Sequence, residues 1–236
     1  MRRHRASRAV TLVEVLIAIA LVAVVTGGAV TSMGLVASAR LKRSASMLAG
    51  AIRVAYAHAN AKSKPVRLVF DLEQRLVILE ESSAPTMALK KKDATGGAAA
   101  ATEAERAAIE EAESILKGPR VARPSFQATK AFGWNLEQDR PGKELEKGVR
   151  FLQVETAHQD EPIHAGRAYL YFWPGGQTER AAIQLIRSDA ERPEEGTVMT
   201  VLVSPLTGKA SILKGAVSMP QPRDDREESE RQDSSW

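Results

Sequence analysis

The sequence predicts an α+β protein, in which a long N-terminal helix is followed by an antiparallel β-sandwich that carries a low-complexity insertion. Three observations support this fold class. Glu14 is the only ionisable residue in the apolar stretch 10–39, and about 20 apolar residues suffice for a helix to cross a bilayer. Apolar residues then recur at helical spacing up to residue 59. After Pro65 the period changes to two, and turn-forming residues separate short apolar runs.

Residues 10–62 are expected to form one helix in two environments. The stretch 10–39 is the predicted transmembrane helix, and 40–62 continue it as an amphipathic helix. The continuation is predicted by one apolar stripe, made of Leu41, Ala45, Leu48, Ile52, Ala55 and Ala59. Two alternatives remain open: a hinge between two helices near Gly27, Gly28 or Gly34, and a secretory signal peptide that ends in the small residues 37–39.

Residues 63–217 are expected to form the sandwich. The run 66–80 alternates apolar and polar side chains around a turn near 71–74, which predicts a hairpin. Further strand-like runs occupy 149–155, 168–173, 181–186, 197–203 and 210–213. Turns containing Pro and Gly separate the later runs, at 174–176, 193–196 and 205–208. Short strands at this spacing are typical of an antiparallel sandwich or meander.

Two segments of biased composition complete the chain. The insertion at about 81–148 is rich in Ala, Gly, Glu and Lys, and it is expected to contain at most one short exposed helix within 103–117. Its three consecutive lysines at 90–92 are expected to form a solvated turn, with contact to anionic lipid as the alternative. The tail 218–236 is highly charged and is expected to be disordered.

The distribution of charge makes nucleic acid an unlikely partner. The formal net charge of +4 by itself would be compatible with binding nucleic acid. Residues 1–9, however, contain four arginines and no acidic residue: Arg2, Arg3, Arg5 and Arg8. Without them, 29 basic residues would face 29 acidic ones, so the chain after residue 9 is formally neutral.

The side chains offer little support for catalysis, and no enzyme is predicted. The chain has no cysteine, which excludes a disulfide framework and cysteine-ligated metal. His158 and His164 lie in the run HQDEPIH, which is expected to be a polar loop, whereas metal ligands must converge from rigid elements. Glu179 and Arg180 are expected to form an exposed ion pair worth at most about 1 kcal/mol. The chain has no phosphate-binding loop or nucleophile elbow, so no catalytic residue, metal or cofactor is predicted.

The stretch RAVTLVEVLIAIALVAVV at 8–25 resembles the class III leader of type IV pilin-like proteins. In that family a short basic leader ends in a small residue, and the mature chain begins with a hydrophobic residue followed by Thr-Leu-x-Glu. The resemblance implies that residues 1–9 are the leader and that prepilin peptidase cleaves between Ala9 and Val10 and methylates the Val10 amine. Glu14 becomes the fifth residue of the mature chain. The family usually has Gly before the cleavage site and Phe after it, so Ala9 and Val10 depart from its pattern.

The C-terminal half resembles the H-type minor pseudopilin of type II secretion systems (GspH/FimT-like). Two segments carry this resemblance: YFWPGGQTERAAIQL at 171–185 and VLVSPLTGKASIL at 201–213. This resemblance implies a long helix and a sandwich of two antiparallel sheets. It further implies a single-pass protein of the inner membrane with its C-terminal domain in the periplasm, in agreement with the positive-inside rule for the leader arginines. The implied partners are other major and minor pseudopilins, prepilin peptidase, inner-membrane lipid and the inner-membrane secretion platform.

The expected function is that of a minor subunit, assembled into or at the tip of a pseudopilus that supports export of folded periplasmic proteins. Glu14 is expected to pair with the N-terminal amine of a neighbouring subunit inside an apolar helical bundle, because a paired buried charge costs much less than a lone one. Two other functions remain open. One is a minor type IV pilin of the FimT class, in pilus assembly or DNA uptake, for which Lys209 and Lys214 could form a local basic patch. The other is a signal-anchored periplasmic enzyme.

Overall fold

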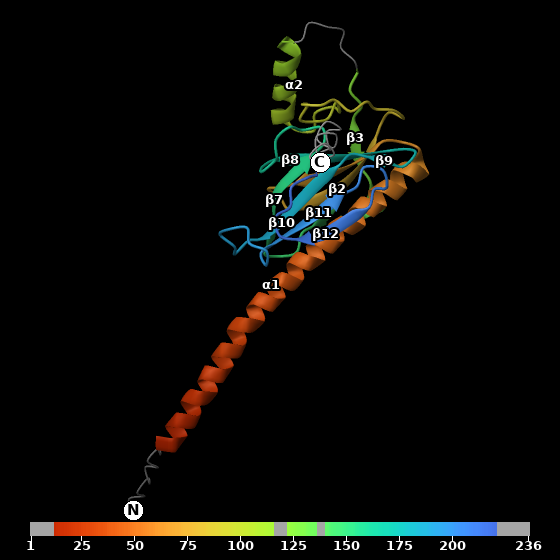
Figure 1. Ribbon diagram of the computed structural model, residues 1–236. Helices are drawn as coiled ribbons and strands as arrows, with labels where there is room; N and C mark the ends of the chain where they lie inside the picture. The colour runs from red at the N-terminus through yellow and green to blue at the C-terminus, as the bar shows by residue number, and fades with distance from the viewer. Residues whose placement is uncertain (1–11, 116–121, 136–139, 221–236) are drawn as a thin grey trace, which may run out of the picture. The chain divides into compact units, whose positions relative to one another are not determined.

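The structure is a computed structural model that describes residues 12–115, 122–135 and 140–220, with the side chains of 24–35, 114–115 and 134–135 left out (Figure 1). The chain divides into two compact units, Met1–Ala39 and Arg40–Trp236. We call them the N-terminal unit and the sandwich unit.

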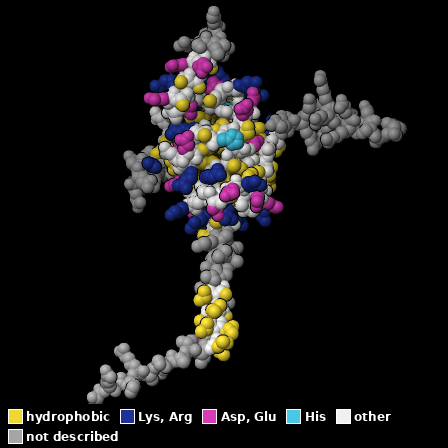
Figure 2. All heavy atoms as spheres, turned by 90° about the vertical axis from the view of Figure 1, so that its left-hand side faces the viewer, with side chains coloured by type: hydrophobic (Ala, Val, Ile, Leu, Met, Phe, Trp, Pro, Cys, Tyr) yellow, Lys and Arg dark blue, Asp and Glu magenta, His cyan; other side chains and the backbone are white. Residues whose placement is uncertain are grey.

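Helix α1 (Leu12–Lys62) begins in the N-terminal unit and ends in the sandwich unit. Its backbone is helical through Gly27, Gly28 and Gly34. In the N-terminal unit every described side chain from residue 12 to residue 23 is exposed, and Figure 2 shows these hydrophobic side chains in yellow. Among the residues that the structure describes, no helix is both long enough and apolar enough to cross a membrane.

The part of α1 in the sandwich unit is amphipathic, as its periodicity predicts. All six residues of the predicted stripe are buried, from Leu41 at 2% exposure to Ala59 at 0%. Lys42, Arg43 and Arg53 lie off the stripe and are exposed. Because residues three and four apart share a helix face, the stripe gives α1 one continuous apolar side.

The strands form two larger antiparallel sheets and a small one. The six-stranded sheet has the order β3-β2-β1-β8-β9, with β6 also paired to β2; its strands are β1 (Val66–Asp71), β2 (Leu76–Ser82), β3 (Phe126–Ala128), β6 (Lys143–Glu144), β8 (Arg167–Trp173) and β9 (Gln177–Thr178). The four-stranded sheet has the order β12-β11-β10-β7; its strands are β7 (Val149–Thr156), β10 (Ala181–Arg187), β11 (Val198–Val203) and β12 (Ala210–Lys214). The two-stranded sheet pairs β4 (Trp134–Asn135) with β5 (Arg140–Pro141). The predicted α+β class with antiparallel sheets is confirmed.

The predicted hairpin at 66–80 is also confirmed. β1 pairs antiparallel with β2, with Leu68 opposite Leu79. The turn between them is held by Asp71, whose carboxylate Oδ1 accepts a hydrogen bond from the Gln74 backbone N–H at 2.8 Å. Arg75 adopts a φ of 57° at the end of this turn, which places it in the left-handed region.

The main core lies between the two larger sheets and the apolar side of α1. Residues alternate between the two faces of each strand, so Leu68, Phe70, Leu170 and Phe172 point into this core from the six-stranded sheet. Phe70 meets Phe151 of the other sheet edge to face, with ring centroids 5.9 Å apart. The sandwich and the second part of α1 therefore share one core.

The insertion is more ordered than its composition predicts. It contains α2 (Glu103–Ile115), within the range expected for a short helix, together with β3–β6 and the 3₁₀-helix η1 (Lys130–Phe132). Phe132 and Leu145 belong to the main core. Other insertion residues cover the outer face of the six-stranded sheet, where they pack with Val69, Ile78, Tyr169 and Tyr171 in a second apolar cluster. The reason is that this outer face carries large aromatic side chains, which are stabilised by being covered.

Lys90, Lys91 and Lys92 are exposed in a turn, as expected, and Lys92 lies 2.9 Å from Asp160. Of the predicted disordered tail, residues 218–220 are described and the rest lies outside the described residues.

Candidate functional site

The residues expected to act in processing and assembly lie at the start of the chain. Ala9 and Val10 are outside the described residues. Glu14 lies in the first turn of α1 and is exposed. With Val15, Ala18, Ile19 and Val22 it lines a shallow hollow of about 390 Å³. The structure therefore places the Glu14 carboxylate on an apolar helix surface beside the small side chain of Ala18.

Glu14 is surrounded by exposed apolar side chains. Leu12 is 79% exposed and Leu16 is 61% exposed, so this helix surface presents apolar side chains at almost every position. Such a surface is unfavourable in water and is stabilised by an apolar environment or by other helices. A carboxylate on such a surface is stabilised by a positively charged group.

The two glycine turns that carry the C-terminal resemblance hold the end of α1. Gly176 and Gly208 have φ values of 83° and 58°, which glycine adopts without strain. Tyr56 of α1 packs against both: a Cβ added at Gly176 would lie 2.6 Å from the Tyr56 hydroxyl oxygen, and one at Gly208 would lie 2.3 Å from its Cδ2. The Gly175 backbone N–H also donates to the Asn60 side-chain oxygen at 3.0 Å. We call this arrangement the Tyr56 clasp.

Sequence analysis did not find the Tyr56 clasp, although it identified both turns. The available signal was the spacing of Tyr56 and Asn60, which lie four residues apart and so share one face of the helix. The contact itself joins residues more than a hundred positions apart, as the Asn60–Gly175 separation of 115 shows. The clasp gives the glycines a physical role, since any side chain at Gly208 would overlap the Tyr56 ring.

His158 and Glu179 form a buried pair, which corrects two expectations. His158 Nδ1 lies 2.7 Å from Glu179 Oε2, and the two side chains are 0% and 2% exposed. Glu179 Oε1 accepts a further hydrogen bond from the Tyr171 backbone N–H at 3.0 Å. The expected exposed pair between Glu179 and Arg180 is therefore wrong, because Glu179 points into the protein rather than along the strand edge.

The two histidines of the HQDEPIH run do not come together. His158 is buried, whereas His164 is exposed and lies 3.4 Å from the Leu152 carbonyl oxygen. His158 Nε2 and Thr156 Oγ1 have no hydrogen-bond partner within the described part of the chain. The expected polar loop thus holds for His164 only. In the same part of the chain, no group of three or more His, Cys, Asp or Glu could hold a metal ion.

Arg67 is a buried cation on the outer face of the six-stranded sheet, and sequence analysis missed it. Its guanidinium lies between two aromatic rings, 4.4 Å from the centroid of Phe126 and 4.2 Å from that of Tyr169. Its Nε donates to the Glu80 carboxylate at 2.7 Å. Burial raises the pKa of Tyr169 far above its usual value, and the hydrogen bond to Glu105 of α2 raises it further. Tyr169 is therefore neutral and donates to Glu105, so this network fastens the insertion to the sheet.

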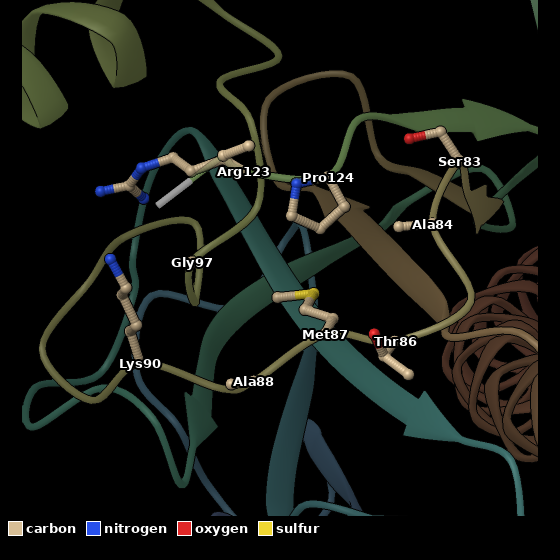
Figure 3. Close-up of a pocket in the computed structure, with 10 residues that line it drawn as sticks. Ser83, Ala84, Thr86, Met87, Ala88, Lys90, Gly97, Arg123 and Pro124 are labelled. Atoms are coloured by element: carbon tan, nitrogen blue, oxygen red, sulfur yellow. The ribbon is translucent and has the colours of Figure 1, made fainter. Parts of the chain in front are cut away.

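One hollow of the sandwich unit is lined by residues of the insertion. Its volume is about 810 Å³, and it is lined by residues from the segments 83–90 and 122–124 and by Gly97. Figure 3 shows Met87 in the middle of this hollow and the nitrogen ends of Lys90 and Arg123 at one end of it. Arg123 already binds two carboxylates, Asp93 at 2.7 Å and Glu113 at 3.1 Å. The charge of Arg123 is thereby compensated within the protein.

Comparison with known proteins gives one match. Residues 4–30 match the family model of the prokaryotic N-terminal methylation motif, and this range contains Ala9, Val10 and Glu14. No curated protein and no solved structure matches the chain. The motif is that of structural, pilin-type proteins rather than of an enzyme family. The match supports a type IV pilin-like protein that is processed by prepilin peptidase and assembles with other pilin-type subunits.

Proposed function

We propose that the chain is an H-type minor pseudopilin of a type II secretion system, anchored in the inner membrane with its sandwich in the periplasm. Cleavage between Ala9 and Val10 and methylation of the Val10 amine prepare it for assembly into or at the tip of the filament. It then supports the export of folded periplasmic proteins. The observation that supports the H type most directly is the Tyr56 clasp, since both segments of the resemblance meet on α1 there.

The proposed anchor is the apolar stretch 10–39, whose only ionisable residue is Glu14. A lone carboxylate near the middle of a bilayer helix costs roughly 3 kcal/mol on insertion scales. Near the start of the helix the cost is lower, because the carboxylate can reach the membrane surface. The single acid is therefore compatible with insertion.

The proposed assembly step pairs the Glu14 carboxylate with the Val10 amine of a neighbouring subunit. Cleavage creates this amine, so the pair can form only after processing. In an apolar bundle the pair is retained because separating it would leave two uncompensated charges, at a cost of several kcal/mol. The pairing therefore selects processed subunits in the correct axial register.

The test is the variant Glu14→Ala in the full chain, with Glu161→Ala as the matched control because Glu161 is exposed in the sandwich unit. We expect E14A to be cleaved and membrane-associated like the unaltered protein but to lose co-purification with other pilin-type subunits and to lower secretion. E161A should change neither. Unchanged co-purification and secretion in E14A would contradict the proposed role, and mass measurement of the mature N-terminus separately tests cleavage before Val10.

A minor type IV pilin of the FimT class is the second possibility, and one observation favours it. Lys209 and Lys214 are both exposed at the two ends of β12, the edge strand of the four-stranded sheet. A gel-shift assay with duplex DNA at two salt concentrations distinguishes the two functions, since binding to phosphates weakens steeply as salt increases. Salt-sensitive binding that is lost in K209Q/K214Q would favour the FimT class, and no binding would favour the pseudopilin.

A further inference from the structure

The sandwich unit begins with three exposed basic residues, Arg40, Lys42 and Arg43, which we call the basic turn. Leu41 lies between them and is 2% exposed in the main core. The basic turn is therefore fixed to the sandwich rather than being a loose linker. On a helix, positions 40, 42 and 43 point in three different directions around the axis, so positive charge surrounds the turn on every side except that of Leu41.

The charge of the basic turn is not compensated within the described part of the chain. No described carboxylate forms an ion pair with Arg40, Lys42 or Arg43. The sequence has no acidic residue between Glu14 and Asp71, which excludes local pairing along α1.

The neighbouring loop does not supply a compensating charge either. The Glu146 backbone N–H donates to Ser44 Oγ at 3.1 Å, which holds this loop beside the start of the sandwich unit. Lys147 follows Glu146 and is exposed, so Glu146 and Lys147 together add no net charge. Figure 2 shows basic and acidic side chains mixed over the visible surface of the sandwich unit.

The position of the basic turn in the sequence indicates its partner. It directly follows the apolar stretch 10–39, and a basic cluster next to a membrane-inserted helix lies at the level of the lipid headgroups. Long basic side chains reach phosphates there while their stems contact apolar surface. An acidic protein surface could also match the charge, but the adjacency to the apolar stretch favours phosphate.

We propose that the basic turn binds the phosphates of anionic phospholipids on the sandwich side of the membrane. This inference rests on the proposed function, because it requires the stretch 10–39 to lie in the bilayer. Each basic residue near an anionic membrane surface strengthens binding by about fivefold. Before cleavage, basic residues flank the apolar stretch on both sides, with the four leader arginines before it and the basic turn after it. After cleavage only the basic turn remains, and it holds the sandwich unit against the membrane until the subunit is assembled.

The experiment uses the full chain with one introduced cysteine, Ser46→Cys, which is selectively labelled because the chain has no cysteine. Ser46 is exposed on α1 next to the basic turn. The labelled protein is reconstituted in vesicles of phosphatidylcholine alone or with phosphatidylglycerol, and quenching by acrylamide is measured, because this neutral quencher is not itself repelled by an anionic surface. We expect acrylamide quenching to be about twofold weaker in the phosphatidylglycerol vesicles, and this difference to disappear at high salt.

The matched variants remove two positive charges each from the exposed side of the same helix. K42Q/R43Q should abolish the effect of phosphatidylglycerol, whereas R53Q/K62Q should retain it, since Arg53 and Lys62 are exposed but lie further from the apolar stretch. Equal quenching in both vesicle types, or equal loss in both double variants, would overturn the proposal. Competition by inorganic phosphate beyond that of chloride at the same ionic strength would instead assign the site to free phosphate.

Two further outcomes separate this inference from the proposed function. Protein that fails to float with neutral vesicles at all would contradict membrane insertion and so both proposals. Protein that floats with neutral vesicles but shows no effect of phosphatidylglycerol on quenching would contradict only the lipid contact.

An acidic protein partner is tested separately. If K42Q/R43Q behaves like the unaltered protein in vesicles but loses co-purification with other subunits, the basic turn binds an acidic protein surface and the lipid proposal is wrong.

Discussion

The two parts of α1 contrast in how their apolar side chains are covered. Leu16 in the N-terminal unit is 61% exposed, whereas Leu48 in the sandwich unit is 0% exposed. Both belong to the same helix and have the same side chain. The difference is that the second part shares the main core with the sandwich, whereas the described side chains 12–23 of the first part are exposed. The first part is therefore a surface for an external environment, and the second is part of a folded domain.

The largest expected effect tests this contrast directly. Leu48→Ala should destabilise the sandwich unit by about 4 kcal/mol, because it leaves a cavity in the main core. Leu16→Ala should leave the unfolding midpoint unchanged, since its side chain is exposed. Urea unfolding of the full chain in detergent, followed by tryptophan fluorescence, measures both. Equal destabilisation by the two variants would show that the N-terminal part also belongs to the cooperative core.

The second prediction tests the Tyr56 clasp. Gly208→Ala should cost about 3 kcal/mol, since it adds backbone strain and overlap with the Tyr56 ring. Gly148→Ala is the control, because Gly148 also has a positive φ, 83°, but has nothing within 4 Å of an added Cβ. It should show only the strain, about 1 kcal/mol. The same unfolding assay applies, and similar losses in both variants would rule out the ring overlap as a cause.

The third prediction concerns the buried His158–Glu179 pair. Glu179→Ala should cost about 2 kcal/mol, because it leaves the Tyr171 backbone N–H and the His158 ring without their acceptor in a buried place. Arg180→Ala should change stability by less than about 1 kcal/mol, as expected for a partly exposed residue outside the pair. A larger loss for R180A than for E179A would restore the exposed-pair interpretation.

The smallest expected effect is a dependence on pH. Burial alone would raise the pKa of Asp93, but hydrogen bonds from Arg123 and Thr95 hold it below its usual value. The stabilisation is therefore complete above the unfolded-state pKa of about 4 and is lost as the pH falls through the lower pKa of the folded protein. Since both partners are partly exposed, its size should be below about 1 kcal/mol.

The measurement for Asp93 is the melting temperature between neutral and acidic pH. Asp93→Asn should be less stable near neutral pH and should lose part of the decline on acidification. Asp160→Asn is the control, because Asp160 pairs with Lys92 at the surface, where the side chains are 64% and 76% exposed. An identical acid profile for D93N and the unaltered protein would contradict the assignment.

The sequence by itself determined the elements that depend on local spacing. The stripe from Leu41 to Ala59 predicted the buried side of α1, and alternation predicted β1 and β2, because the periods of a helix and a strand are properties of neighbouring residues. The methylation motif at 4–30 is local in the same sense. Glu14, Ala9 and Val10 could therefore be named from the sequence, although the pairing of Glu14 with another subunit stays a proposal.

Only the tertiary structure decided which distant residues meet. Glu179 was expected at the surface but is bound to His158, which lies 21 positions away. Arg67 is enclosed by Phe126 from the insertion, and Tyr56 is enclosed by glycine turns far along the chain. The order of the insertion was missed for the same reason, since its Ala- and Gly-rich composition carries no strong period. Which residues become neighbours depends on how strands and sheets close around a common core, and that closure is not encoded in the spacing of any single segment.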